Sequence, residues 1–360
     1  MPESANADPT PIMEPTWAEP DSLLGLIQRG RGAARAAAAA APEAAAECVI
    51  DCIVHDPRWD HQVEHRAWLY SALVADLGID LRHLRAAYTG PVDPSDDADA
   101  GLLVDVLERL VRRGIEDQRA FHVEPPSRTG LGGRAVCDAA DRERILHVAT
   151  ESGLIHRDAT ADFDDEVWET VLFEVAETIL TDESLPLATR IAVRRQLSRL
   201  RSPRALAWAR ANAGLHHEVG GLALSMLTDL AEQSDAVRLL EFLVATGAEG
   251  PRFIYQQCDL VAALERLDHR PAVPAVEAIA DSTVYSYLRK RCARALSRLS
   301  ADFPRGRAIE YLDDCEDETR GIAIVHVDLS VPGVRERLAR TAADTSEDPD
   351  NREAARGRIS

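Results

Sequence analysis

Four segments in the second half of the chain repeat the pattern x-Leu-x-x-Leu. Successive segments are offset by 30, 37 and 32 residues, and they are Gln196–Leu200, Met226–Leu230, Ala263–Leu267 and Ala295–Leu299. Four positions before the first leucine of each segment stands another apolar or small residue: Val193, Ala223, Leu260 and Cys292. Spacings of three and four residues place these positions on one face of an α-helix. The pattern therefore predicts four related helices, each with a stripe that must be buried.

Each of these helices is followed by a short polar turn and a second apolar segment. That segment begins with a residue typical of a helix cap or first turn: Pro203, Asp235, Pro271 and Pro304. A helical hairpin of this size cannot bury both apolar faces alone, so it stacks on its neighbours. The sequence predicts an all-α fold, a right-handed α-solenoid of stacked antiparallel helical hairpins, with a less regular helical N-terminal half.

The repeated segments resemble HEAT repeats. Arg289–Leu299 reads R-x-x-C-x-x-A-L-x-x-L, which is similar to the arginine, small residue and leucine signature of that family, and Arg190–Leu200 reads R-x-x-V-x-x-x-L-x-x-L. The two middle units have Gly220 and Gln257 where the signature has arginine. The resemblance covers about residues 186–330 and implies a HEAT-like scaffold that presents an extended surface.

Composition divides the rest of the chain. Residues 1–20 are rich in proline and acids and are expected to be a disordered lead-in, followed by an N-terminal helical region at 21–124. A Pro/Gly-rich linker is expected at 125–136, because prolines and glycines are concentrated there. The HEAT-like repeat region then spans 137–341, and a polar tail, expected to fray, spans 342–360.

The charge of the chain excludes some partners. Its formal net charge is −20 and its isoelectric point is near 5.0, and the cationic residues are scattered rather than gathered in one block. Such a chain repels a phosphate backbone, so nucleic acid is an unlikely partner. Neither a signal peptide nor a membrane segment is recognisable, and the six cysteines lack a CxxC motif. We expect a cytoplasmic protein with reduced thiols and no cofactor.

One short motif raises the possibility of metal chemistry. His61–His65 reads H-x-x-E-H, the inverted zincin pattern in which two histidines hold zinc and Glu64 is the general base. In a helix that starts at Asp60, however, Val63, Ala67 and Tyr70 would form the buried stripe, and the histidines would face away from it. We therefore favour a solvated histidine pair and no bound metal.

Two groups of residues are candidates for binding. Arg58 and Trp59 occupy a turn between two helices, where they either anchor a partner or plug the turn. The second group forms aligned columns in the repeats, and consists of Arg190, Arg195, Arg289 and Arg294. Such columns either pair with acids of neighbouring repeats or receive an acidic peptide in a groove.

The sequence thus favours a non-catalytic protein-binding scaffold or adaptor, with a protein or acidic peptide as its partner. The alternative is an enzyme on a HEAT-like scaffold. Such an enzyme would be a zinc hydrolase using His61, Glu64 and His65, or a nucleic-acid base-repair enzyme. The repeats alone specify neither the partner, nor the face that binds it, nor the oligomeric state.

Overall fold

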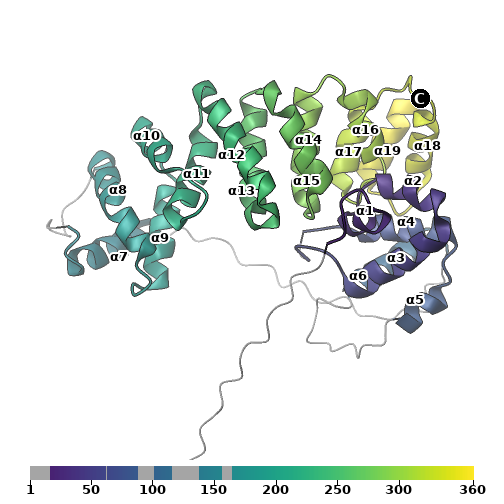
Figure 1. Cartoon of the computed structure of the whole chain (residues 1–360), viewed down its shortest axis with the longest axis horizontal. Helices are drawn as coiled ribbons and strands as arrows, with labels where there is room; N and C mark the ends of the chain where they lie inside the picture. Colours follow the sequence, from purple (N-terminus) through teal and green to yellow (C-terminus); the bar gives the residue numbers. More distant parts are fainter. Residues whose placement is uncertain (1–16, 62, 88–100, 116–137, 156–163) are drawn as a thin grey trace, which may run out of the picture. The chain divides into compact units, whose positions relative to one another are not determined.

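The computed structural model describes residues 17–61, 63–87, 101–115, 138–155 and 164–360 (Figure 1). Every regular element in these ranges is a helix, which confirms the all-α class. None of the helices described is both long and apolar enough to cross a bilayer. The expected linker at 125–136 and most of the expected lead-in lie outside the described residues.

Contacts between residues divide the chain into two compact units. The first unit takes the described residues within 1–118, 284–290 and 302–360, and the second takes those within 119–283 and 291–301. One helix, α15 (Ser286–Leu299), contributes residues to both. The N-terminal helices therefore share a unit with the C-terminal residues and not with the middle of the chain.

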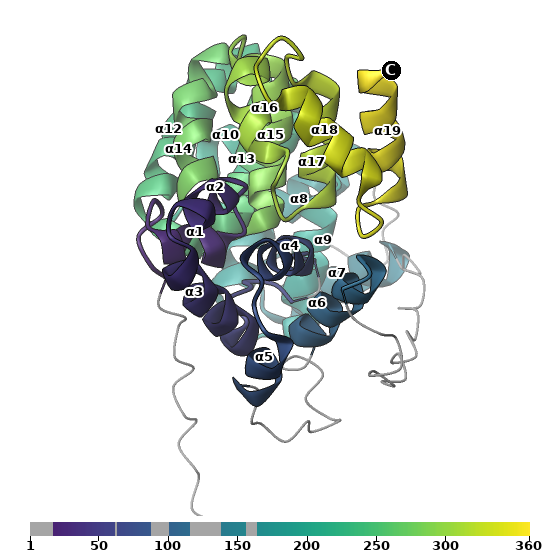
Figure 2. The same cartoon turned by 90° about the vertical axis from the view of Figure 1, so that its right-hand side faces the viewer.

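The first unit contains two groups of helices. The N-terminal group is α1 (Leu23–Arg29), α2 (Ala33–Ala40), α3 (Pro42–His55), α4 (Ala67–Leu77), α5 (Leu81–Ala87) and α6 (Gly101–Arg112). The C-terminal group, preceded by the start of α15, is η5 (Phe303–Arg305), α16 (Arg307–Tyr311), α17 (Asp317–His326), α18 (Val334–Ala343) and α19 (Pro349–Ile359). Figure 2 shows α3, α4 and α6 in contact with one another.

Gly30 is one of the points where the two groups approach closely. It ends α1 with a φ of 67°, a conformation that favours glycine. A Cβ atom there would lie 2.5 Å from Sγ of Cys315, and the carbonyl oxygen of Gly30 accepts a hydrogen bond from the backbone N–H of Cys315. Glycine is required here for both reasons.

Helix α4 is buried along most of its length. All eight residues from Ala67 to Val74 are buried, so the helix is a central element and not one with a single apolar stripe. The helix begins at Ala67 and not at Asp60, and Val63 is 37% exposed, so its expected burial is wrong. The reason is local, because the carboxylate of Glu64 accepts hydrogen bonds from the backbone N–H groups of Trp59 and Asp60 and stabilises a turn there.

The tail does not fray as expected. Residues 349–359 form α19, which contacts α17 and α18, and Asn351 and Ala355 are buried. Glu347, just before the helix, forms a buried ion pair with Arg320 of α17 at 2.7 Å. This ion pair holds the C-terminal segment in place, although the segment has few apolar residues.

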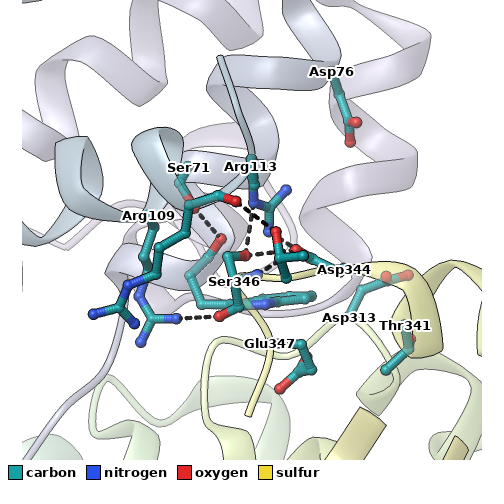
Figure 3. A network of polar contacts seen from close by, with 12 residues as sticks. Ser71, Asp76, Arg109, Arg113, Asp313, Thr341, Asp344, Ser346 and Glu347 are labelled. Carbon is teal, nitrogen blue, oxygen red and sulfur yellow. Dashed lines mark hydrogen bonds and ion pairs between the residues drawn. The ribbon is translucent and has the colours of Figure 1, made fainter. Parts of the chain in front are cut away.

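A polar network joins the same loop to α6 (Figure 3). Arg109 donates to the carbonyl oxygen of Ser346 at 2.9 Å, and Nε of Arg113 donates to Oγ of Ser346 at 2.8 Å. Arg113 also lies 2.9 Å from the carboxylate of Asp344. We call this network the terminal clasp, since it connects the N-terminal and C-terminal helices of the first unit.

The second unit is a succession of short helices. They are α7 (Asp138–Glu151), α8 (Asp165–Thr181), α9 (Leu187–Leu197), α10 (Pro203–Asn212), α11 (Glu218–Leu230), η2 (Gln233–Asp235), α12 (Ala236–Ala248), η3 (Gly250–Phe253), α13 (Ile254–Arg266), η4 (Arg270–Ala272), α14 (Val273–Ser282) and the later residues of α15. The expected apolar stripe is confirmed at two of its three positions, since the first leucine of each pair and the residue four positions before it are buried. At the third position Leu200 and Leu230 are only half-buried, and Leu200 lies beyond the end of α9. Helix α10 begins at Pro203, as predicted.

Helices of the second unit contact their neighbours in chain order and also the next helix but one. Contacts join α10 to α11 and α12 to α13, and further contacts join α11 to α13 and α12 to α14 (Figures 1 and 2). Phe173 of α8 stacks on Trp208 of α10, with ring centres 5.5 Å apart. The helices thus form an odd-numbered row (α9, α11, α13) and an even-numbered row (α8, α10, α12, α14).

Arginines connect successive helices of each row. Arg238 of α12 donates to the carbonyl oxygens of Arg210 and Ala213 at the end of α10. Arg266 of α13 donates to the carbonyl oxygens of Thr228 and Ala231 at the end of α11. Each guanidinium satisfies C-terminal carbonyls that a helix leaves without intrahelical partners.

Candidate functional site

Two of the four aligned arginines are exposed and bind acids of neighbouring helices. Arg195 lies 2.7 Å from the carboxylate of Asp141 in α7, and Arg294 lies 3.1 Å from that of Glu265 in α13. Among the candidate binding residues, these two arginines are exposed yet ion-paired. The observed pairs match the first of the two alternatives, in which the columns bind neighbouring repeats.

Two other arginines of the columns are in different surroundings. Arg289 is fully buried, and its guanidinium binds both carboxylate oxygens of Asp314, at 2.6 and 3.2 Å. Burial alone would lower the pKa of Arg289, but Asp314 outweighs it and the pKa is raised. Arg190 is half-buried in α9, with its Nε atom buried. Arg289 therefore stabilises the first unit and is not accessible to a partner.

The turn residues Arg58 and Trp59 differ in exposure. The guanidinium of Arg58 is almost buried and binds the carboxylate of Asp56, at 2.5 Å from Nη2 to Oδ2. Trp59 is 36% exposed. Only Trp59 of the two presents much of its side chain to a partner.

The carboxylate of Glu64 in the H-x-x-E-H motif is fully engaged. One oxygen accepts hydrogen bonds from Arg66 and from the backbone N–H and hydroxyl of Ser286, and the other accepts from the backbone N–H groups of Trp59 and Asp60. Burial alone would raise the pKa of Glu64, but Arg66 and these hydrogen bonds outweigh it and lower the pKa. An anion held in this way is a structural counter-ion and is not free to take a proton from a metal-bound water.

The two histidines of the motif do not form a metal site with Glu64. His61 and His65 are exposed, and Nδ1 of His61 lies 3.3 Å from the carboxylate of Asp56. Across the described ranges, no group of three or more His, Cys, Asp and Glu side chains has the geometry to hold a metal ion.

A cavity of about 620 Å³ in the first unit is built around ion pairs. Its wall includes Arg35, which binds Asp76 at 2.6 Å and Asp313 at 2.8 Å, and Arg337, which also binds Asp313. These pairs connect α2, α4 and α18 with the residues that follow α16. We therefore regard this cavity as part of the structural core of the first unit.

A second cavity, of about 470 Å³, lies in the second unit at the start of α11. We call it the α11 pocket; it is lined by Arg194, Leu215, His216, His217, Glu218, Gly221, Leu222, Arg252, Phe253 and Gln256. Its residues come from α9, the 213–217 connection, α11, η3 and α13. All three helices of the odd-numbered row thus contribute to one pocket.

Local structure positions the pocket residues. The imidazole Nδ1 of His217 accepts a hydrogen bond from the backbone N–H of Gly220 and so caps α11. The ring of His216 lies edge-on to that of Phe253, with centres 6.2 Å apart. The Arg252 guanidinium lies 5.4 Å from the centre of the Phe253 ring, within cation–π range.

The α11 pocket carries more cations than anions. Glu218 contributes a single carboxylate, and this lies 2.5 Å from Arg194. Within the described residues, Arg252 has no carboxylate partner. The lining is therefore cationic, in a chain of strongly negative net charge.

Sequence reasoning missed this pocket, although a signal was present. Between Leu185 and His217 the chain has seven arginines and no acidic residue, so the cations are not evenly scattered. Acids of other helices pair with five of these arginines: Arg194, Arg195, Arg201, Arg204 and Arg210. Arg252, the cation without a carboxylate partner in the pocket, lies outside this stretch, so only the fold brings it there.

No protein-family model, curated protein or solved structure matches the chain.

Proposed function

We propose that this chain is a non-catalytic protein-binding scaffold whose second unit is a HEAT-like, right-handed α-solenoid. The two rows of helices support this reading, because contacts join α8 to α9, α10 to α11 and α12 to α13, and further contacts join α11 to α13 and α12 to α14. Arg238 and Arg266 each connect a helix to the end of the helix two before it, as expected of units that stack.

The observation that carries the proposal is a set of exposed apolar side chains on the helices that line the α11 pocket. Leu187 and Ile191 of α9 are 63% and 43% exposed, and Tyr255 of α13 is 57% exposed. All three lie on helices of the odd-numbered row, which also lines the pocket. A pocket with exposed apolar side chains on the same row is typical of a protein-binding surface.

The enzyme alternatives have less support. The general base of a zinc hydrolase would be Glu64, whose two oxygens are already occupied by protein donors. A base-repair enzyme needs a free basic face for the phosphate backbone. Five of the seven arginines between Leu185 and His217 are instead paired with carboxylates.

Site-specific photocrosslinking in the native host tests the proposal. A photoreactive amino acid replaces Tyr255 of α13 in one strain and Val244 of α12 in another, because these side chains are 57% and 58% exposed on opposite rows. We expect one stoichiometric protein adduct from position 255 and none from position 244. A protein captured equally at both positions, or at neither, would contradict binding through the odd-numbered row.

A further inference from the structure

The α11 pocket joins a cation to an apolar wall. The Arg252 guanidinium belongs to its lining, and the half-buried side chains of Leu215 and Leu222 supply apolar surface. The carboxylate of Glu218 forms an ion pair with Arg194 at 2.5 Å, so it does not neutralise the charge of Arg252. A ligand that brings one carboxylate and one apolar group complements this lining.

Gly221 opens the wall of the pocket. It lies in the first turns of α11, where a Cβ atom would meet no other atom within 4 Å. The neighbouring Gly220 is different, since a Cβ there would lie 2.9 Å from the His217 ring and 3.0 Å from the carbonyl oxygen of Gly214. Position 221 therefore has room for a ligand, whereas position 220 is closed by the protein itself.

The surface next to the pocket continues along the odd-numbered row. Ile191 precedes Arg194 by one turn on α9, and Tyr255 precedes Gln256 of the pocket lining on α13. Since residues three apart share a helical face, a bound chain that leaves the pocket over α9 would reach the exposed Ile191. The site is therefore suited to an extended peptide and not only to a small anion.

From these observations we infer that the α11 pocket binds an extended acidic segment of a partner protein. The segment places a Glu or Asp carboxylate against Arg252 and a large apolar side chain against Leu215 and Leu222. This inference rests on the proposed scaffold function and assigns that function a specific site and a specific chemistry of partner.

The test uses the full chain as bait for a displayed library of random dodecapeptides. Gly221→Trp fills the pocket without a backbone clash, and Gly357→Trp is the matched control, because a Cβ at Gly357 of α19 also meets nothing within 4 Å. Circular dichroism verifies that both variants are folded. We expect enriched peptides to carry an acidic residue within two or three positions of a large apolar one.

A synthetic peptide with the enriched sequence then tests the charge pair. Binding, measured by fluorescence anisotropy, should weaken on the order of tenfold in Arg252→Glu. Replacing the acidic residue of the peptide by lysine should restore binding to that variant. Gly221→Trp should abolish binding, and Gly357→Trp should leave it unchanged.

Three outcomes overturn the inference. Enriched peptides without acidic residues, or peptides that still bind Gly221→Trp, would leave the scaffold function standing and remove the pocket from it. A library that yields no peptide, together with a crosslinked partner at position 255, would also place binding outside the pocket. Failure of both the library and the crosslinking would remove the proposed function as well.

Discussion

The guanidinium carbon of Arg320 lies 3.8 Å from the centre of the Trp68 ring. The same guanidinium binds both carboxylate oxygens of Glu347 at 2.7 Å and donates to the carbonyl oxygens of Asp314 and Cys315 at 2.8 Å. One side chain of α17 thus connects α4, the loop before α19 and the residues that precede its own helix. Since all of these groups are buried, this contact contributes directly to the stability of the first unit.

Arg320→Met should destabilise the first unit by about 3–5 kcal/mol, because the change leaves the buried Glu347 carboxylate without its partner. Hydrogen exchange of α4 peptides measures the effect. The matched control is Arg305→Met, whose partner Asp328 is 2.7 Å away on the surface of the same unit; its effect should be far smaller, because solvent screens an exposed pair. Equal effects of the two changes would contradict the role given to Arg320.

Glu64→Gln should cost the first unit about 3–5 kcal/mol at pH 7, since Arg66 is fully buried and loses its counter-ion. The pKa of Glu64 is lowered in the folded state, so its charge stabilises the fold above the ordinary pKa of a glutamate. That contribution is lost as the pH falls through the lowered pKa. The difference in unfolding free energy between wild type and Glu64→Gln should therefore shrink as the solution is acidified below about pH 4.3.

Urea unfolding at a series of pH values measures this difference. Glu318→Gln is a suitable control, because Glu318 forms an exposed pair with Lys290 and its loss should cost less than about 1 kcal/mol. A difference for Glu64→Gln that stays constant down to pH 3 would contradict the lowered pKa.

Replacing the two adjacent glycines of α11 by alanine, one at a time, should change the stability of the second unit in opposite directions. Gly221→Ala should stabilise the second unit by about 0.5–1 kcal/mol, because alanine favours the helix and its Cβ meets no other atom. Gly220→Ala should destabilise it by about 1–3 kcal/mol, because its Cβ would press against the His217 ring and the Gly214 carbonyl oxygen. Thermal unfolding of the two variants measures both effects, and the same sign for both would contradict the geometry of the pocket wall.

Deletion of residues 349–360 should loosen helices far away in the sequence. The deletion removes Asn351, whose side-chain amide donates to Glu347 and to the carbonyl oxygen of Asp317. We expect faster hydrogen exchange in α4 and α6, which contact the loop held by these bonds, and unchanged exchange in α12. Unchanged exchange in α4 would show that α19 is dispensable to the first unit.

Much of the second unit could be predicted from the sequence, because its signal is local. The first leucine of each pair and the residue four positions before it fall on one helical face and are buried, and Pro203 starts a helix as expected. The start of α4 could not be predicted in this way. The turn at Asp60 depends on Glu64, and Glu64 is held by Ser286, which no local pattern connects to it.

The candidate site was predicted less well than the fold. Arginine columns were visible in the sequence, but their partners Asp141, Glu265 and Asp314 are known only from the structure. The pocket depends on Arg252, which lies far from the arginine-rich stretch in the sequence. The polar tail was misjudged because composition does not reveal a buried ion pair such as Arg320 with Glu347.

The terminal clasp also has a consequence for how the protein is made. Arg109 and Arg113 leave the ribosome long before Ser346, and at about 5–20 residues per second the delay is roughly tens of seconds. During that interval Trp68 and Arg66 lack the partners that bury them, while all of α7–α14 is synthesised. The nascent N-terminal helices are thus a natural client for chaperones, and the second unit can complete its fold before the first.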